Sequence, residues 1–183
     1  MTEDIDPNAV VAFWKAAGPD RWFAKDDAFD AAFSRRFMAA HLAAARRELD
    51  DWGATPDGAL ALLILLDQFP RNVWRGTGHA FATDPLGRRV ALQTVAADLD
   101  LALENDLRRF VYLPLQHSEG MEDQDRQVEL FQTRMTRAPD DRWAEHHRDI
   151  IVRFGRFPHR NAALGRESTP EELAWLADEG FKG

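Results

Sequence analysis

Residues 55–70 read TPDGALALLILLDQFP and hold the longest apolar run of the chain. Thr55 can cap a helix with its hydroxyl, and Pro56 suits the first helical position, where an N–H would have no partner. The aliphatic residues that follow cover every side of a helix, so we expect this helix to lie buried at the centre of the fold. Phe69-Pro70 is expected to end it, because proline lacks an N–H and disfavours helical backbone before it.

Helical periodicity continues on both sides of this segment. Phe29, Phe33 and Phe37 recur every four residues, which places them on one face of a long helix. No segment alternates apolar and polar residues for long enough to indicate a strand, so we predict an all-α protein of about eight helices. We expect a single domain over residues 1–183. The other helices are predicted from Pro7 to the stop at Gly18, from Asp26 to Leu49, from Thr83 to Leu103, from Leu107 to an end at Pro114, from Glu122 to Met135, from Pro139 to Phe154, and from Thr169 onward.

The composition excludes several classes of function. The 183 residues include 23 Lys and Arg against 31 Asp and Glu, giving a formal net charge of −8. Such a balance argues against a nucleic-acid binder, which needs a basic surface to displace counterions. Cysteine is absent, which excludes disulfides, a thiol nucleophile and Cys-ligated zinc. The acidic start of the chain is unlike a signal peptide, and the apolar run over residues 59–66 is too short to span a membrane. We therefore expect a cytoplasmic protein that binds neither nucleic acid nor membrane.

A short internal repeat is the most specific local feature. LDQFPRN at residues 66–72 is echoed by FGRFPHRN at residues 154–161, and in both cases a glycine follows after three further residues. In the structural interpretation both segments end helices, with arginines bonding the terminal carbonyls. In the functional interpretation two related loops face each other and present Arg71 and Arg160 to one anionic ligand.

The charge distribution also points to an anion site. Residues 142–166 carry six arginines, three histidines and only two acids, whereas the rest of the chain is net acidic. Asp67 ends the apolar helix and is expected to be at least half buried, so it needs a partner such as an arginine from one of the two loops. The alternative interpretation of Asp67 is an internal salt bridge or a helix cap.

Two histidines are candidates for a chemical role. In LPLQHSE at residues 113–119, His117 and Glu119 could be a general base and its orienting partner, or two metal ligands. Alternatively, His117 caps a helix end and Glu119 starts the next helix. His147 lies on the apolar stripe of its helix, which is typical of a hydrogen-bonded core residue. If it opens onto a pocket, it joins His117 and His159 as groups that titrate near neutral pH.

Several strings, in order along the chain, resemble a known family. The sequence is similar to the bacterial proteins of domain of unknown function 924 over nearly its whole length, and Leu115-Gln116 departs from the Phe-Glu expected there. The resemblance implies an all-helical, tetratricopeptide-like αα-superhelical fold. The family has no established activity, so it implies no catalytic residues. The matching strings are Arg21-Trp22-Phe23 with Phe29-Asp30, LDQFPRN at residues 66–72, AFATD at residues 80–84, LPLQHSE at residues 113–119 and the run from His147 to Thr169.

The main hypothesis from the sequence is a pocket that binds a small carboxylate or phosphate. Arginines would hold the anion, and the sequence specifies neither a metal nor a cofactor. The residues predicted to line this pocket are Asp67, Arg71, Asn72, His117, Glu119, His147, Arg156, His159, Arg160 and Asn161.

Two alternatives stay open beside this hypothesis. The first is an enzyme that uses His117 or His147 as general base, with or without a metal, and with Glu119 as a further catalytic candidate. The second is a scaffold that binds a protein partner on a concave helical surface. Its contact patch would come from exposed tryptophans, with Trp14, Trp22, Trp52 and Trp74 as the candidates.

Overall fold

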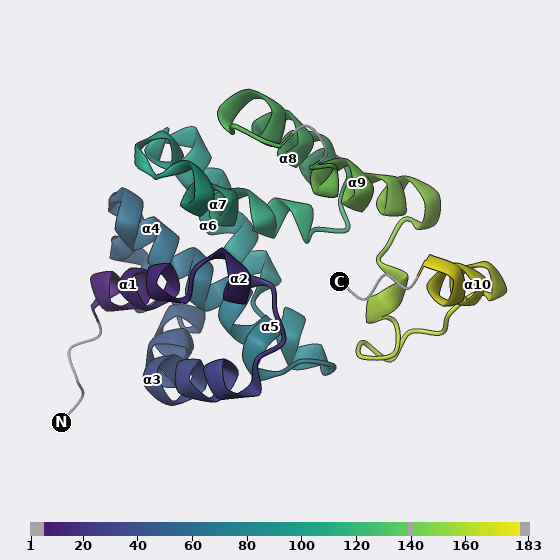
Figure 1. Ribbon diagram of the computed structural model, residues 1–183, viewed down its shortest axis with the longest axis horizontal. Helices are drawn as coiled ribbons and strands as arrows, with labels where there is room; N and C mark the ends of the chain where they lie inside the picture. Colours follow the sequence, from purple (N-terminus) through teal and green to yellow (C-terminus); the bar gives the residue numbers. More distant parts are fainter. Residues whose placement is uncertain (1–5, 139–140, 180–183) are drawn as a thin grey trace.

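Three helices begin at a residue whose side chain caps them. Asp6, Asp26 and Thr55 each precede a helix and accept hydrogen bonds from backbone N–H groups of its first turn. The computed structural model describes residues 6–138 and 141–179, and within these ranges the chain forms helices and no strand (Figure 1). The predicted all-α class is therefore confirmed. The helices are α1 (Pro7–Ala17), α2 (Pro19–Trp22), α3 (Asp27–Ala45), α4 (Pro56–Leu63), α5 (Phe69–Val73), α6 (Asp84–Ala96), α7 (Asn105–Gln116), α8 (Met121–Arg134), α9 (Trp143–Phe154) and α10 (Pro170–Glu179).

The apolar segment lies at the centre of the core, as predicted. Each residue from Leu60 to Leu66 is at least 98% buried. The helix α4 packs against α1, α6 and α7, so its neighbours cover it on several sides. This burial explains why the segment tolerates apolar residues all round, since no side of it faces water.

The prediction that Phe69-Pro70 ends this helix is wrong. The chain passes from α4 through a π-helical turn, Ile64–Gln68, and continues as α5 to Val73. Proline removes one helical hydrogen bond and crowds the carbonyl four residues earlier, here that of Leu66. That carbonyl instead accepts a hydrogen bond from the Thr83 hydroxyl at 2.5 Å, and the carbonyl of Leu65 accepts one from His41 at 2.8 Å. Side chains from α3 and from the start of α6 thus donate hydrogen bonds to backbone carbonyls of the widened turn.

Other predicted boundaries move by a few residues. The helix expected to end at Pro114 continues to Gln116, and the one expected to reach Leu49 ends at Ala45. The helix α6 ends at Ala96 instead of Leu103, and α9 begins at Trp143. Pro139 and Asp140, which were expected to start α9, lie outside the described residues.

An aromatic cluster fills the core between α1, α3 and α7. Trp14 is fully buried and packs against Trp22, Phe33 and Phe110. Trp22 is also buried and donates its indole N–H to the carbonyl of Trp14 at 2.7 Å. Trp14 and Trp22 therefore cannot form the exposed contact patch of the scaffold hypothesis.

The C-terminal part adds a smaller apolar cluster. The helix α9 packs along α8, and α10 lies beyond it at the far end of the molecule (Figure 1). Phe157 and Trp175 join Ile150 and Ile151 in a core separate from the main one. None of the helices formed by the described residues has the length and apolar character needed to cross a membrane.

Candidate functional site

The two Phe-Pro segments meet in space, at Asp84. Arg71 follows Pro70 in α5 and donates two parallel hydrogen bonds to the Asp84 carboxylate, at 2.9 and 3.0 Å. Arg160 follows Pro158 in a short helical turn, and its Nη1 lies 3.5 Å from Oδ2 of the same carboxylate. The guanidinium groups of both arginines lie over the ring of Phe81. The arginines of the internal repeat therefore form one cluster.

Asp67 is the buried anion of this cluster. Its side chain is only 1% exposed, and one carboxylate oxygen lies 2.8 Å from Nδ1 of His117 and 2.9 Å from Nη1 of Arg71. The Gln68 amide donates to the other oxygen at 2.6 Å. Burial raises the pKa of Asp67, but the charge of Arg71 and the contacts with His117 and Gln68 outweigh it and hold the pKa at about 2. The expectation that Asp67 has an arginine partner from one of the two loops agrees with this geometry, and that partner is Arg71.

His117 receives its orientation from Asp67, not from Glu119. It lies at the C-terminal end of α7, with its side chain 15% exposed. Its Nδ1 contacts Asp67, while its Nε2 makes no hydrogen bond to any described residue. Burial and the charge of Arg71 hold the pKa of His117 below its ordinary value, although Asp67 raises it. A neutral imidazole with a fixed ring and a free Nε2 can accept a proton or a hydrogen bond there.

Glu119 has a different role. Its carboxylate accepts two hydrogen bonds from the Arg166 guanidinium, at 2.8 and 3.0 Å, and one from the backbone N–H of Phe157 at 2.8 Å. These bonds tie the segment after α9 to the end of α7. The interpretation of Glu119 as the partner that orients His117 is therefore wrong, because both its oxygens are engaged elsewhere.

Arg160 is the least satisfied charge in the cluster. Its side chain is 7% exposed and its Cζ lies between the rings of Phe81 and Phe157, 4.7 and 4.5 Å from their centroids. It donates no hydrogen bond to another described residue, and its buried Nε has no partner. Burial and the charge of Arg71 lower the pKa of Arg160 to about 10. A buried guanidinium with unused donors is the feature that most resembles an anion site.

His147 and His159 lie around this cluster. The His147 ring centroid is 6.4 Å from that of His117 and 5.8 Å from that of Phe157, and its Nδ1 contacts the carbonyl of Trp143 at 2.8 Å. His147 is buried on the inner face of α9, as its place on the apolar stripe predicts. Burial lowers the pKa values of His147 and His159 to about 3, with Arg160 contributing to both. Both imidazoles are therefore neutral at physiological pH.

Besides Glu119, three predicted residues do not join the cluster. Asn72 donates to Asp30 at 2.6 Å and so ties α5 to α3. Arg156 pairs with Glu172 of α10 at 2.7 Å, and Asn161 donates to the same carboxylate at 3.2 Å. All three hold neighbouring segments together through side-chain contacts.

The sequence reasoning missed Asp84, Phe81 and Phe157 as parts of the site. Phe81 and Asp84 lie in the AFATD string that contributes to the family resemblance, at the predicted start of the helix from Thr83. The AFATD string is therefore the feature of the sequence that could have pointed to Phe81 and Asp84. Among the described residues, no group of three or more histidines, aspartates and glutamates is placed to hold a metal ion.

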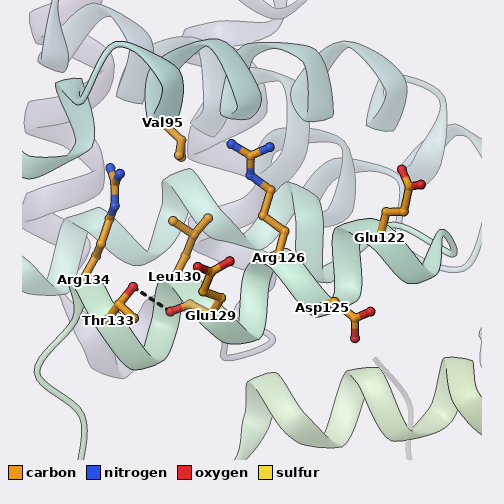
Figure 2. Close-up of a pocket in the computed structure, with 8 residues that line it drawn as sticks. All are labelled: Val95, Glu122, Asp125, Arg126, Glu129, Leu130, Thr133 and Arg134. Carbon is orange, nitrogen blue, oxygen red and sulfur yellow. Dashed lines mark hydrogen bonds between the residues drawn. The ribbon is translucent and has the colours of Figure 1, made fainter.

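A separate pocket of about 710 Å³ lies between α6 and α8 (Figure 2). Val95 and Leu130 form its apolar part, and none of the predicted site residues lines it. Three acids and two arginines give it no excess positive charge, and Arg134 already pairs with Asp100. The pocket therefore does not suit an anion. Its polar lining consists of Glu122, Asp125, Arg126, Glu129, Thr133 and Arg134.

Comparison with known proteins places the chain beside other proteins without an assigned activity. Residues 10–180 match the family model described as bacterial protein of unknown function (DUF924). A solved structure of a protein of unknown function from Agrobacterium tumefaciens is similar, with a TM-score of 0.90 and 52% sequence identity. The similarity covers 95% of this chain and 97% of that chain. No curated protein matches.

Proposed function

The chain belongs to the DUF924 family of bacterial proteins of unknown function, and we propose from the contacts of its own residues that it binds a small anion at Arg160. The ligand would be a carboxylate or a phosphate. The observation that carries this proposal is the buried guanidinium of Arg160, which donates no hydrogen bond to a described residue. Burying a charged donor without acceptors is costly, so sites of this kind usually receive an acceptor from a ligand or water.

The surroundings of Arg160 favour an acceptor in the plane of its guanidinium. Phe81 and Phe157 cover the guanidinium by cation–π contacts, which stabilise the charge but accept no N–H hydrogen bond. Asp84 already takes two hydrogen bonds from Arg71 and lies at 3.5 Å from Arg160, beyond a good hydrogen bond. The N–H groups of Arg160 are therefore left for an oxyanion, to which arginine can donate two parallel bonds.

A thermal-shift experiment tests the anion site. Inorganic phosphate at 100 times its dissociation constant is expected to stabilise the protein by about 2.7 kcal/mol, which raises the unfolding midpoint by roughly 5–10 °C. The shift is measured against chloride at matched ionic strength, and acetate is tested in the same way. In Arg160→Gln the shift should disappear, because the guanidinium donors are gone.

The matched control is Arg148→Gln. Arg148 carries the same charge, but it pairs at the surface of α9 with the exposed Asp125. Its phosphate response should equal that of the wild type. Each variant is compared with its own anion-free midpoint, so a loss of stability is not mistaken for a loss of binding. Equal responses to phosphate and chloride, or a full phosphate response in Arg160→Gln, would contradict the proposal.

The pair of Asp67 and His117 favours a second candidate function, an enzyme with His117 as general base. A buried carboxylate on Nδ1 selects the tautomer that leaves the Nε2 lone pair free, and it stabilises the imidazolium that forms after proton transfer. Burial keeps His117 neutral near pH 7 and therefore able to accept a proton. The substrate would lie beside Arg160 and give its own proton to Nε2, so in this candidate function His117 stays neutral until the chemical step and takes up no proton on binding.

Binding and turnover can be separated in His117→Gln. With any anion that the protein both binds and converts, this variant is expected to lose a factor of about 10²–10⁴ in kcat. The phosphate-induced shift should persist near pH 7, because Arg160 is intact. Unchanged kcat in His117→Gln would exclude His117 as the base and leave the binding function standing.

Three sequence-based expectations stay predictions beside this proposal. They are the cytoplasmic location, the tetratricopeptide-like superhelical arrangement and the scaffold alternative with a protein partner. The scaffold alternative now lacks Trp14 and Trp22 as contact residues, since both are buried.

A further inference from the structure

The charges of the cluster balance before any ligand arrives. Arg71 and Arg160 contribute two positive charges, and Asp67 and Asp84 contribute two negative charges. An added anion would therefore leave a net negative charge among side chains that are largely removed from water. Such a charge is costly unless a positive charge is added with it.

His117 is the group placed to supply that positive charge. Its Nδ1 is fixed on Asp67 at 2.8 Å, so a proton added at Nε2 produces an imidazolium that Asp67 stabilises. Nε2 makes no hydrogen bond to a described residue, and the side chain is 15% exposed, so both a proton and a ligand can reach it. His147 lies deeper, with its Nδ1 on the carbonyl of Trp143.

The groups around His117 come from four neighbouring segments. They are Asp67 in the π turn, Arg71 in α5, His147 in α9, and both His159 and Arg160 in the turn after α9. Arg71 and Arg160 disfavour a positive imidazole, whereas Asp67 favours it. An anion on Arg160 offsets one of the two unfavourable charges, and it also offers an acceptor to Nε2–H.

We infer that the anion enters together with a proton, so that an imidazolium at His117 and the guanidinium of Arg160 hold it between them. This inference rests on the proposed function and specifies its ligand. The ligand is the conjugate base of a small acid, with one oxygen for Arg160 and one for Nε2 of His117. The proton moves from solvent to Nε2 and stays there as long as the anion is bound.

Proton uptake gives the affinity a defined pH dependence. Bound anion raises the pKa of His117 above its value in the free protein, because it adds negative charge beside the ring. Between those two pKa values, the association constant should rise as pH falls, by up to tenfold per pH unit. Above both pKa values the affinity should not depend on pH, because His117 is then neutral with or without ligand.

Calorimetry with sodium sulfate tests this inference. Sulfate stays a dianion from about pH 5 to about pH 8, so a change in protonation belongs to the protein. Titration in two buffers of different ionisation enthalpy gives the number of protons taken up. We expect uptake to be largest at a pH between the two pKa values of His117, where it approaches one proton per sulfate. In His117→Gln sulfate should still bind, with uptake near zero.

The control variant is His146→Gln. His146 neighbours His147 in the sequence but is only partly buried on α9, and its replacement should leave proton uptake unchanged. Imidazole ¹⁵N resonances of the wild type provide a readout that needs no variant. The pKa of His117 should rise when sulfate is added.

The outcomes separate this inference from the proposed function. Sulfate binding without proton exchange in either buffer would overturn proton coupling and leave the anion site standing. Full uptake in His117→Gln would overturn the assignment to His117. If neither sulfate nor phosphate binds at any pH in the range, the anion site and the proton coupling both fail.

Discussion

Asp67→Ala is expected to destabilise the protein by about 3–5 kcal/mol. The carboxylate is 1% exposed and contacts His117, Arg71 and Gln68, so its removal leaves buried donors without an acceptor. Arg71 keeps its bidentate pair with Asp84, which is why we do not expect complete unfolding. Equilibrium unfolding in urea at neutral pH measures the loss as a lower midpoint with an unchanged slope.

The matched control is Asp125→Ala. Asp125 also pairs with an arginine, Arg148, but its side chain is 59% exposed. The expected change is within about 0.5 kcal/mol, because water replaces an exposed ion pair at little cost. A loss below about 1 kcal/mol in Asp67→Ala would contradict the role of Asp67 as the buried acceptor of the cluster.

The contribution of Asp67 should also depend on pH in a defined window. The folded pKa of about 2 lies below the ordinary value of 3.8, so the folded protein favours the charged form. The resulting stability is present above about pH 4 and is lost as pH falls through about 2; it amounts to roughly 2 kcal/mol. The stability difference between the wild type and Asp67→Ala should therefore narrow on acidification over this window.

Phe157→Ala is expected to cost about 3–5 kcal/mol, equivalent to a drop of roughly 6–20 °C in the unfolding midpoint. Phe157 is fully buried in the small C-terminal cluster and packs against His147 and the guanidinium of Arg160. Its loss leaves a cavity and frees Arg160 on one face. The phosphate-induced thermal shift should therefore fall together with stability.

Two other substitutions serve as controls for the loss of stability in Phe157→Ala. Phe157→Leu keeps most of the volume and should cost less than about 1.5 kcal/mol. Leu173→Ala removes an exposed apolar side chain from α10 and should change stability within about 0.5 kcal/mol. Equal losses for Phe157→Ala and Leu173→Ala in thermal unfolding would show that the C-terminal cluster adds little to the fold.

Helix starts and the buried central helix could be predicted because they depend on neighbouring residues. Thr55 and Pro56 are next to the turn they cap, and the aliphatic run from residue 59 excludes a solvent-facing side. The stop at Pro70 could not be predicted correctly. The helix continues there through a π turn, and His41 and Thr83, from other segments, bind the carbonyls of Leu65 and Leu66.

The candidate site likewise has features that the sequence predicts and features that depend on distant residues. Arg71, Arg160, Asp67 and His117 could be selected from the sequence because the repeat and the residue types point to an anion. The hydrogen-bond partners of these side chains could not be predicted from the sequence. Glu119 is two residues from His117 but binds Arg166, whereas Asp67, 50 residues away, holds the imidazole.

By itself, the sequence determined the helical class, the central buried helix and the residue types available for the site. Periodicity and capping act within a few residues, so they can be recognised without knowing the packing. Only the tertiary structure decided that both arginines of the repeat converge on Asp84 and that Arg160 keeps its donors unused. Hydrogen bonds require atoms within about 3 Å, and it is helix packing, not spacing along the chain, that brings distant residues that close.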